Sequence, residues 1–287
     1  MKTQINEKGF TLVELAIVMA IIGLLIGGIL KGQELMENAR VASTVTQVKA
    51  TEAAMTTFRD TFNGIPGDLA RADTRLPGCP GAANDCEAGG AGAGLATTGD
   101  GSVGTPNVLI SAQSVAPLAG DETDETTLFW THLLLSDLLG GLTDSAIQDG
   151  TFIGWGDTHP AAKIGGGFTV AFSGGLATTV AATDAAIPGR PAVGGEVTDN
   201  IPVGTVLILR SNINGALTAN PGVQAVSPLR AAQIDRRIDD GKSTGGTVQG
   251  YGVAGSCFVD ATGAAGGSFY NETLKSKDCG MILQIQG

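Results

Sequence analysis

The fold of this chain is decided by one stretch near its N-terminus, Lys8-Gly9-Phe10-Thr11-Leu12-Val13-Glu14-Leu15. It opens an apolar run from Phe10 to Leu30 in which only Thr11 and Glu14 carry polar side chains. A helix over these 21 residues is long enough to cross the hydrocarbon core of a bilayer. Lysines precede the run, which predicts a single membrane span with its N-terminus in the cytoplasm.

The small residue Gly9 stands before the apolar run, whereas a secretory signal peptide is cut after its apolar core. Glu14 lies inside the run, where a carboxylate costs about 2.5 to 3.5 kcal/mol on insertion scales. Cleavage between Gly9 and Phe10 would create a positive amine on Phe10, in the same chain or in a neighbouring subunit. The alternative is a carboxylate that reaches the lipid headgroups without a specific partner.

Beyond Leu30 the helix is predicted to continue to Phe62. The residues that predict this form a single apolar stripe at helical spacing: Val41, Val45, Val48, Met55, Phe58 and Phe62. A helix from Phe10 to Phe62 would be about 80 Å long, far more than a bilayer needs. Its amphipathic half, residues 31–62, is therefore expected to lie against a soluble domain, and the sequence from Asn63 to Asp68 to end the helix.

Composition favours strands, turns and long loops after the helix, because 44 of the 287 residues are glycine and only two are tryptophan. The net charge of −11 and the lack of a basic patch give no indication of nucleic-acid binding. The closest approach to such a patch is Arg230, Arg236 and Arg237, which alternate with Asp235, Asp239 and Asp240.

Four cysteines fall into two groups, Cys79 with Cys86 and Cys257 with Cys279. Neither group has the spacing of a zinc site, so two disulfides in an oxidising compartment are expected. Three pairings of four cysteines are possible, and spacing does not choose among them.

The region after the helix is predicted to be an α+β domain. It begins with a long surface loop from Arg71 to about Pro106. The expected helices are Thr126–Leu139, ended by Gly140 and Gly141, and a short one that Ser227 and Pro228 open and Gly241 ends. The expected strands are Phe168–Phe172, Val203–Arg210, Tyr251–Val259 and Met281–Ile285.

The sequence offers little for catalysis, so no enzyme activity is expected. His132 lies in a leucine-rich helix and His159 in a turn, and no nucleophile motif or H-E-x-x-H motif occurs. No cofactor is expected. Asp260 and Asp278, with Asn271 and Glu272 near them, are weak calcium candidates, although acidic residues that only keep a surface soluble are the better interpretation.

The sequence from Lys8 to Leu15 resembles the processing site of type IV prepilins and of the pseudopilins of type II secretion. In both, a basic residue and a glycine stand before the membrane-length run, which opens with an aromatic residue and carries a glutamate four positions later. Here these residues are Lys8, Gly9, Phe10 and Glu14. The resemblance implies a leader peptide, residues 1–9, that a membrane prepilin peptidase removes after Gly9. It also implies methylation of the Phe10 amine and pairing of Glu14 with a neighbouring N-terminus during assembly.

Two further sequences resemble a subgroup of prepilin-like proteins with large C-terminal domains: Phe58 to Asp68, and Ala232 to Gly241. By the same resemblance, residues 10–30 are the assembly half of the helix and residues 63–287 a globular domain. Cys257 and Cys279 would then close the C-terminal disulfide loop that many pilins carry.

The expected function is therefore that of a structural filament subunit that polymerises with itself. Its implied partners are the prepilin peptidase, an inner-membrane assembly platform and the membrane before assembly. Its implied location is the bacterial inner membrane, then a periplasmic or extracellular filament. The alternatives are a type II secretion pseudopilin and a minor, tip-located pilin or adhesin that acts as a binding module.

Overall fold

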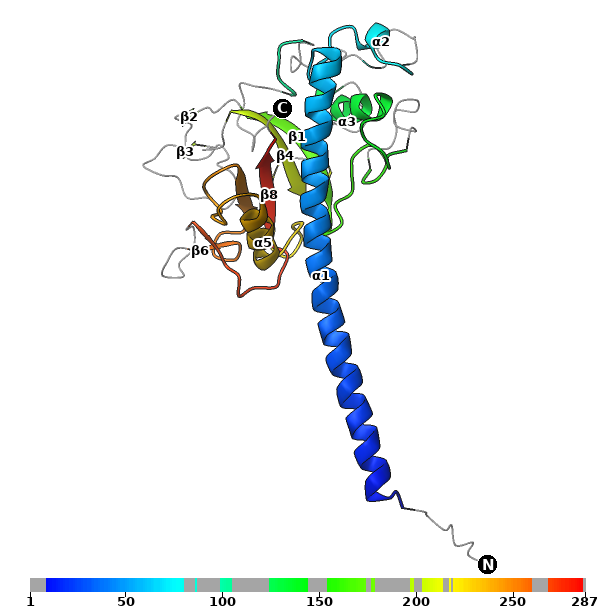
Figure 1. The fold of residues 1–287 in the computed structure, drawn as a ribbon. Coiled ribbons are helices and arrows are strands. Elements are labelled where there is room, and N and C mark those ends of the chain that lie inside the picture. The colour runs from blue at the N-terminus through cyan, green and yellow to red at the C-terminus, as the bar shows by residue number, and fades with distance from the viewer. Residues whose placement is uncertain are drawn as a thin grey trace, which may run out of the picture. The chain divides into compact units, whose positions relative to one another are not determined.

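The computed structural model describes residues 9–79, 86, 99–104, 124–143, 154–173, 177–178, 197–198, 203–213, 217, 219–259 and 268–285. Within them the chain forms two compact units, Met1–Arg40 and Val41–Gly287, which are described separately below. The boundary falls inside helix α1, Leu12–Phe62. The fold is α+β, as the sequence predicts, with a long N-terminal helix and an antiparallel four-stranded sheet (Figure 1).

Helix α1 begins at Leu12, two residues later than the predicted start at Phe10. Thr11 takes the capping position, and Gly9 and Phe10 lie outside the helix. The helix ends at Phe62 as predicted, because Asn63 adopts a left-handed backbone with φ of 48°.

In the second unit, α1 contributes its predicted apolar stripe to the core. Val41, Val48, Met55 and Phe58 are buried, and Val45 and Phe62 pack partly buried against them. Two polar residues that the stripe did not include, Thr44 and Thr51, are buried as well. Thr51 is accommodated because its hydroxyl donates to the carbonyl of Gln47, one turn earlier.

The central sheet has the strand order β1-β4-β8-β5, and all its neighbours are antiparallel. The strands are β1 Gly167–Ser173, β4 Gly204–Arg210, β8 Cys279–Gln284 and β5 Val248–Gly252. Two further pairs of short strands are present. The pair of β2 Ala177–Thr178 with β3 Val197–Thr198 was not predicted, and in the pair of β6 Phe258–Val259 with β7 Phe269–Tyr270 only β6 falls within a predicted strand.

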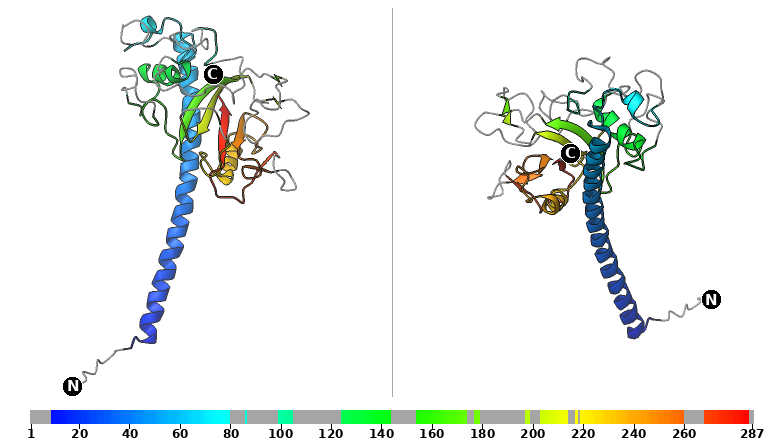
Figure 2. Two further views of the ribbon diagram at one scale, coloured as in Figure 1. Left: turned by 180° about the vertical axis from the view of Figure 1, so that it is seen from behind. Right: turned by 45° about the horizontal axis from the view of Figure 1, so that its top comes forward.

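Alternation along the strands gives the sheet two apolar faces. One face, with Phe168, Val170, Leu207 and Met281, joins the main core with α1. The opposite face carries a smaller cluster around Val206, Ile208, Tyr251 and Ile282. Helix α3, Glu125–Leu135, contacts β1, and α5, Pro228–Ile238, contacts β5, β7 and β8 (Figure 2).

The prediction of a helix over Thr126–Leu139 was wrong at its end, since α3 stops at Leu135. Asp137 adopts the left-handed conformation with φ of 61°. The amide of Leu138 then donates to Leu133, and that of Asp137 to Leu134, which together form a Schellman motif. Aspartate tolerates this conformation, so no glycine was needed to end the helix.

A single strand over Tyr251–Val259 was also wrong. The chain turns after β5 because Gly252 and Gly255 have positive φ and the amide of Cys257 bonds back to the Val253 carbonyl.

The segment from Arg71 to about Pro106 was expected to be a surface loop. In the structure it contributes to the core through Ala72 of helix α2, Ala72–Arg75, and through the buried Leu76, Cys86 and Val103. Helix α5 confirms the prediction, with Ser227 before it and Pro228 in its first turn.

Candidate functional site: the N-terminal segment

Glu14 has a hydrogen-bonding partner in its own chain, the N-terminal neighbour Thr11. The Thr11 hydroxyl donates to Glu14 Oε2 at 2.8 Å, and the Thr11 amide donates to the same oxygen at 2.9 Å. In return, the Glu14 amide donates to the Thr11 hydroxyl at 3.3 Å. This is a capping box, in which two polar side chains satisfy the free amides of the first helical turn.

The sequence does carry a signal for this contact. Thr11-x-x-Glu14, at the start of an apolar helix, is the pattern of a capping box. The predicted partner of Glu14 was instead the Phe10 amine, in the same chain or in a neighbouring subunit. In the structure, Thr11 satisfies one oxygen of the carboxylate without neutralising its charge. Glu14 therefore helps to cap the first turn of the helix and still offers a negative charge there.

The bond between Gly9 and Phe10 lies in non-helical backbone before the capping box. Both residues are exposed, and Phe10 keeps 89% of its surface accessible. Because a protease needs an extended substrate strand, this position just outside the helix suits cleavage better than one within it.

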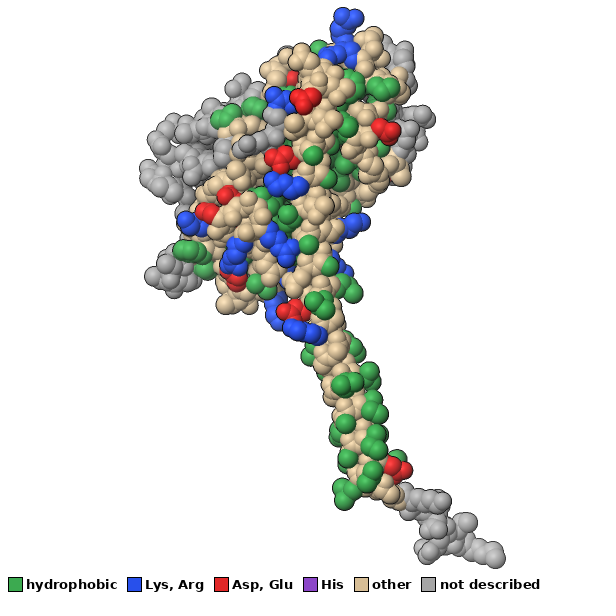
Figure 3. Space-filling model, in the orientation of Figure 1, with side chains coloured by type: hydrophobic (Ala, Val, Ile, Leu, Met, Phe, Trp, Pro, Cys, Tyr) green, Lys and Arg blue, Asp and Glu red, His purple; other side chains and the backbone are tan. Residues whose placement is uncertain are grey.

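The first unit consists of α1 up to Arg40, and its large apolar side chains are exposed all along the helix (Figure 3). They include Leu12, Leu15, Ile21, Leu25, Ile29 and Leu35. Among the described helices, α1 is the one with a stretch long and apolar enough to cross a membrane, judged by length and composition. Such a surface requires lipid or other helices around it.

Both cysteine groups of the sequence are bonded within themselves in the structure. Cys79 pairs with Cys86, with Cα atoms 6.3 Å apart, and Cys257 pairs with Cys279 at 5.3 Å. The segment closed by the second disulfide is fastened to α5 at two points: Tyr270 donates a 2.9 Å hydrogen bond to Asp235, and Glu272 forms an ion pair with Arg236.

Asp260, one of the calcium candidates, lies outside the described residues. The other three already have partners in the protein. Asp278 accepts hydrogen bonds from the Gly222 amide and from Ser276, Asn271 bonds to Gly255, and Glu272 pairs with Arg236.

Both histidines are fully buried. Burial fits the leucine-rich surroundings of His132, whereas His159 was predicted only to lie in a turn. Burial lowers the pKa of His132 to about 4. Burial and the charge of Arg210 lower the pKa of His159 to about 3. Both imidazoles are therefore neutral near pH 7 and closed off from solvent.

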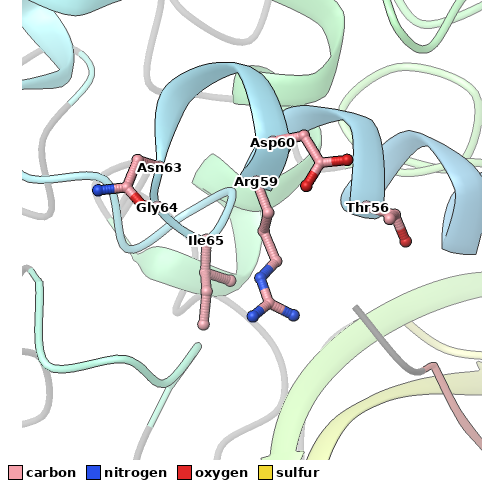
Figure 4. Close-up of a pocket in the computed structure, with 6 residues that line it drawn as sticks. All are labelled: Thr56, Arg59, Asp60, Asn63, Gly64 and Ile65. Atoms are coloured by element: carbon pink, nitrogen blue, oxygen red, sulfur yellow. The ribbon is translucent and has the colours of Figure 1, made fainter.

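A polar cleft of about 460 Å³ lies at the C-terminal end of α1, lined by Thr56, Arg59, Asp60, Asn63, Gly64 and Ile65 (Figure 4). The Arg59 side chain extends on the same side as Ile65 (Figure 4). Neither Arg59 nor Asp60 forms an ion pair among the described residues. The cleft could accommodate a small polar group.

The fold and the N-terminal segment define a class of protein. Its members have an α+β domain preceded by an apolar helix of membrane-spanning length, and the first turn of that helix carries a capping carboxylate, here Glu14. The model of the prokaryotic N-terminal methylation motif matches residues 5–30. The chain thus carries the prepilin-type signal of type IV pilins and pseudopilins. No curated protein and no solved structure matches this chain.

Proposed function

We propose that this chain is the precursor of a type IV pilus-like filament subunit that a prepilin peptidase cleaves between Gly9 and Phe10. Hydrolysis of that amide bond leaves a carboxylate on Gly9 and a free amine on Phe10. The amine then takes a methyl group from a methyl-donor cosubstrate and releases a proton. The observation that carries the proposal is Glu14, an acidic residue at the start of a helix otherwise covered with exposed apolar side chains.

The exposed apolar side chains of α1 need an apolar environment, and a filament provides one. In the bilayer, lipid surrounds the apolar surface of the first unit, and in a filament the helices of neighbouring subunits replace it. The charge of Glu14 fixes the register of this packing, because the Phe10 amine of a neighbour is the complementary group. A carboxylate that only began the helix would need no such neighbour.

The two disulfides support a globular unit on the oxidising side of the membrane. The precursor therefore spans the inner membrane once with residues 1–9 in the cytoplasm, and the unit from Val41 onward faces the periplasm. From there an inner-membrane assembly platform would extract it into a filament outside the membrane.

A second candidate function is a pseudopilin, or a minor subunit at a filament tip that binds a ligand. The size of the second unit and the polar cleft around Arg59 favour it. Immunogold labelling of filaments separates the two cases. Labelling along the whole filament supports the main proposal, and labelling confined to tips supports the alternative.

The test compares Glu14→Gln with Glu14→Ala in cells. Glutamine can still complete a capping box with Thr11 but carries no charge, whereas alanine removes both the cap and the charge. If the charge pairs with a neighbour, both variants lose filaments to a similar degree, while both precursors are still inserted in the membrane.

The readouts are the yield of sheared filaments and the mass and N-terminal sequence of the subunit. A mature chain that starts at methylated Phe10 is expected from wild type. If Glu14→Gln assembles normally while Glu14→Ala does not, capping alone explains Glu14 and the pairing is wrong. A surface chain that still starts at Met1 would overturn the processing step.

A further inference from the structure

The turn that ends α1 consists of an asparagine followed by a glycine. Asn63 and Gly64 come directly after Phe62, the last residue of the helix. Asn63 is exposed and adopts the left-handed backbone conformation, with φ of 48°. Apart from glycine, few residues tolerate this conformation as well as asparagine does. The way in which the helix ends therefore explains the asparagine.

Gly64 is explained by packing. A Cβ at this position would lie 2.6 Å from Cδ1 of Leu69, whose side chain is only 1% exposed. Any larger residue would thus require the buried Leu69 side chain to shift. The end of the helix favours asparagine and the core favours glycine, and together they produce the Asn63-Gly64 pair.

The two groups of this pair that can react with each other are not held by the protein. The side-chain amide of Asn63 and the backbone N–H of Gly64 form no hydrogen bond with any of the residues that the structure describes. The backbone N–H of Asn63, by contrast, donates to the Arg59 carbonyl at 2.8 Å. Because Gly64 has no side chain, its nitrogen is unhindered and its backbone can rotate.

We propose that Asn63 is a site of spontaneous deamidation. The Gly64 nitrogen attacks Cγ of Asn63 and forms a new C–N bond, while the bond from Cγ to the side-chain nitrogen breaks. That nitrogen leaves as ammonia, with the proton of the Gly64 amide. Water then opens the cyclic imide at either carbonyl, which gives aspartate or isoaspartate at position 63. Water is the only other reactant.

The other asparagines in the described part of the chain lack this combination. Each of them precedes a residue other than glycine: Asn38, Asn212, Asn220 and Asn271. Asn271 is also held in place, because its side-chain nitrogen donates to the Gly255 carbonyl at 3.0 Å and its oxygen accepts from Thr273. A second pair, Asn214-Gly215, lies outside the described residues.

Deamidation changes the charge at the end of α1. The free carbonyls at a helix C-terminus carry partial negative charge, so a carboxylate there is unfavourable. Asn63 also lines the polar cleft beside Arg59 and Asp60. Conversion would give the described lining of this cleft a second carboxylate against one guanidinium. Asn63→Asp, which imitates one product, is expected to lower the Tm by about 1 to 3 °C.

The proposal concerns the second unit and does not depend on cleavage or filament formation. The test incubates the full-length chain in detergent at mildly acidic and at mildly alkaline pH, then digests it with trypsin for mass spectrometry. Trypsin cuts after Arg59 and Arg71, so peptide 60–71 contains residue 63 as its only asparagine. Asn214 falls in a separate peptide, 211–230, and is therefore scored independently.

In wild type, peptide 60–71 is expected to convert from amide to acid, and faster at alkaline pH because the attacking nitrogen reacts after losing its proton. Two products of equal mass should separate by chromatography, and an isoaspartate methyltransferase should label one of them. A synthetic peptide of residues 60–71 gives the rate in a free chain. The folded protein should be no more than about tenfold slower, since only the end of a helix has to open.

Asn63→Gln is the blocking variant, because its longer side chain would have to form a larger and less favourable ring. It should leave peptide 60–71 unconverted. Asn271, in peptide 243–275 of the reduced digest, is the internal control and should remain an amide. A folded chain that converts more than about tenfold slower than the free peptide would overturn the proposal, because the native turn would then protect Asn63. Conversion of Asn271 as fast as that of Asn63 would also overturn it.

Discussion

The Gly67 amide donates a 2.9 Å hydrogen bond to Nδ1 of His132. That bond fixes the proton of the neutral imidazole on Nε2, which lies 2.9 Å from the Cys86 carbonyl oxygen and donates to it. The ring also stacks on Phe58 of α1, with centroids 6.0 Å apart. One buried side chain thus joins the turn after α1, helix α3 and the first disulfide.

Replacing His132 with alanine is expected to lower the free energy of unfolding by about 3 kcal/mol. The variant leaves a cavity and deprives a buried amide and a buried carbonyl of their partners. Denaturant unfolding of the full-length chain in detergent measures the loss. The control Thr131→Ala, one residue earlier in α3, should cost less than about 1 kcal/mol, and an equal loss in both variants would contradict the role of the ring.

Gly67→Ala is expected to destabilise the protein by at least about 2 kcal/mol. Gly67 has a φ of 89°, and a Cβ there would lie 3.1 Å from the Phe129 amide nitrogen and against the Glu125 carbonyl oxygen. Gly140→Ala is the matched control, because nothing lies within 4 Å of a Cβ at that position. If Gly67→Ala leaves the free energy of unfolding unchanged, α3 can move away from the turn that contains Gly67.

The Tm is expected to fall as the pH rises from 6.5 to 8. The folded protein holds protons on Glu125, with its pKa near 8, and on Asp235, near 7, whereas the unfolded chain releases both at lower pH. Their stabilisation is complete below the unfolded pKa values and is lost as the pH rises through the folded ones.

The two buried histidines affect the stability in a lower pH range. His132 and His159 stay neutral in the folded protein, so their effect is a loss of stability as the pH falls below about 6.5. Between pH 6.5 and 8 the carboxyl groups therefore act without them. The double variant Glu125→Gln with Asp235→Asn should flatten the Tm across this window, and a slope as steep as that of wild type would refute the assignment.

Removing the disulfides one at a time should reveal unequal contributions. The Cys257–Cys279 bond closes the longer segment, with a sequence separation of 22 against 7 for Cys79–Cys86. In the chain-entropy model the paired serine variants lose about 3 and about 2 kcal/mol, respectively. Non-reducing denaturant titrations test this order, and the reverse order would show that native contacts outweigh loop length.

The C-terminal disulfide segment should depend on Tyr270 more than on its ion pair. Arg236 and Glu272 are 51% and 37% exposed, so a double-mutant cycle is expected to give less than about 0.5 kcal/mol. Tyr270→Phe removes a buried hydrogen bond to Asp235 and should cost about 1 to 2 kcal/mol. A larger coupling for the ion pair than for Tyr270 would reverse this ranking.

Local patterns predicted the elements that local interactions define. The end of α1 at Phe62, helix α5 after Ser227 and strand β4 follow from periodicity, capping and turn residues, which act over a few positions. The same patterns did not predict the end of α3 near Asp137 or the turn after β5 at Gly252. Backbone hydrogen bonds end the helix, and backbone hydrogen bonds and the Cys257–Cys279 disulfide accompany the turn.

By itself, the sequence determined the membrane-length helix, its charged start at Glu14 and the grouping of the cysteines, because each depends on neighbours along the chain. Only the tertiary structure decided that His132 joins Gly67 to Cys86, and that Asp68 and Glu125 accept hydrogen bonds from backbone amides of residues 99–104. These groups are distant in sequence, and their protonation depends on burial and on nearby charge. Neither quantity exists until the chain has folded.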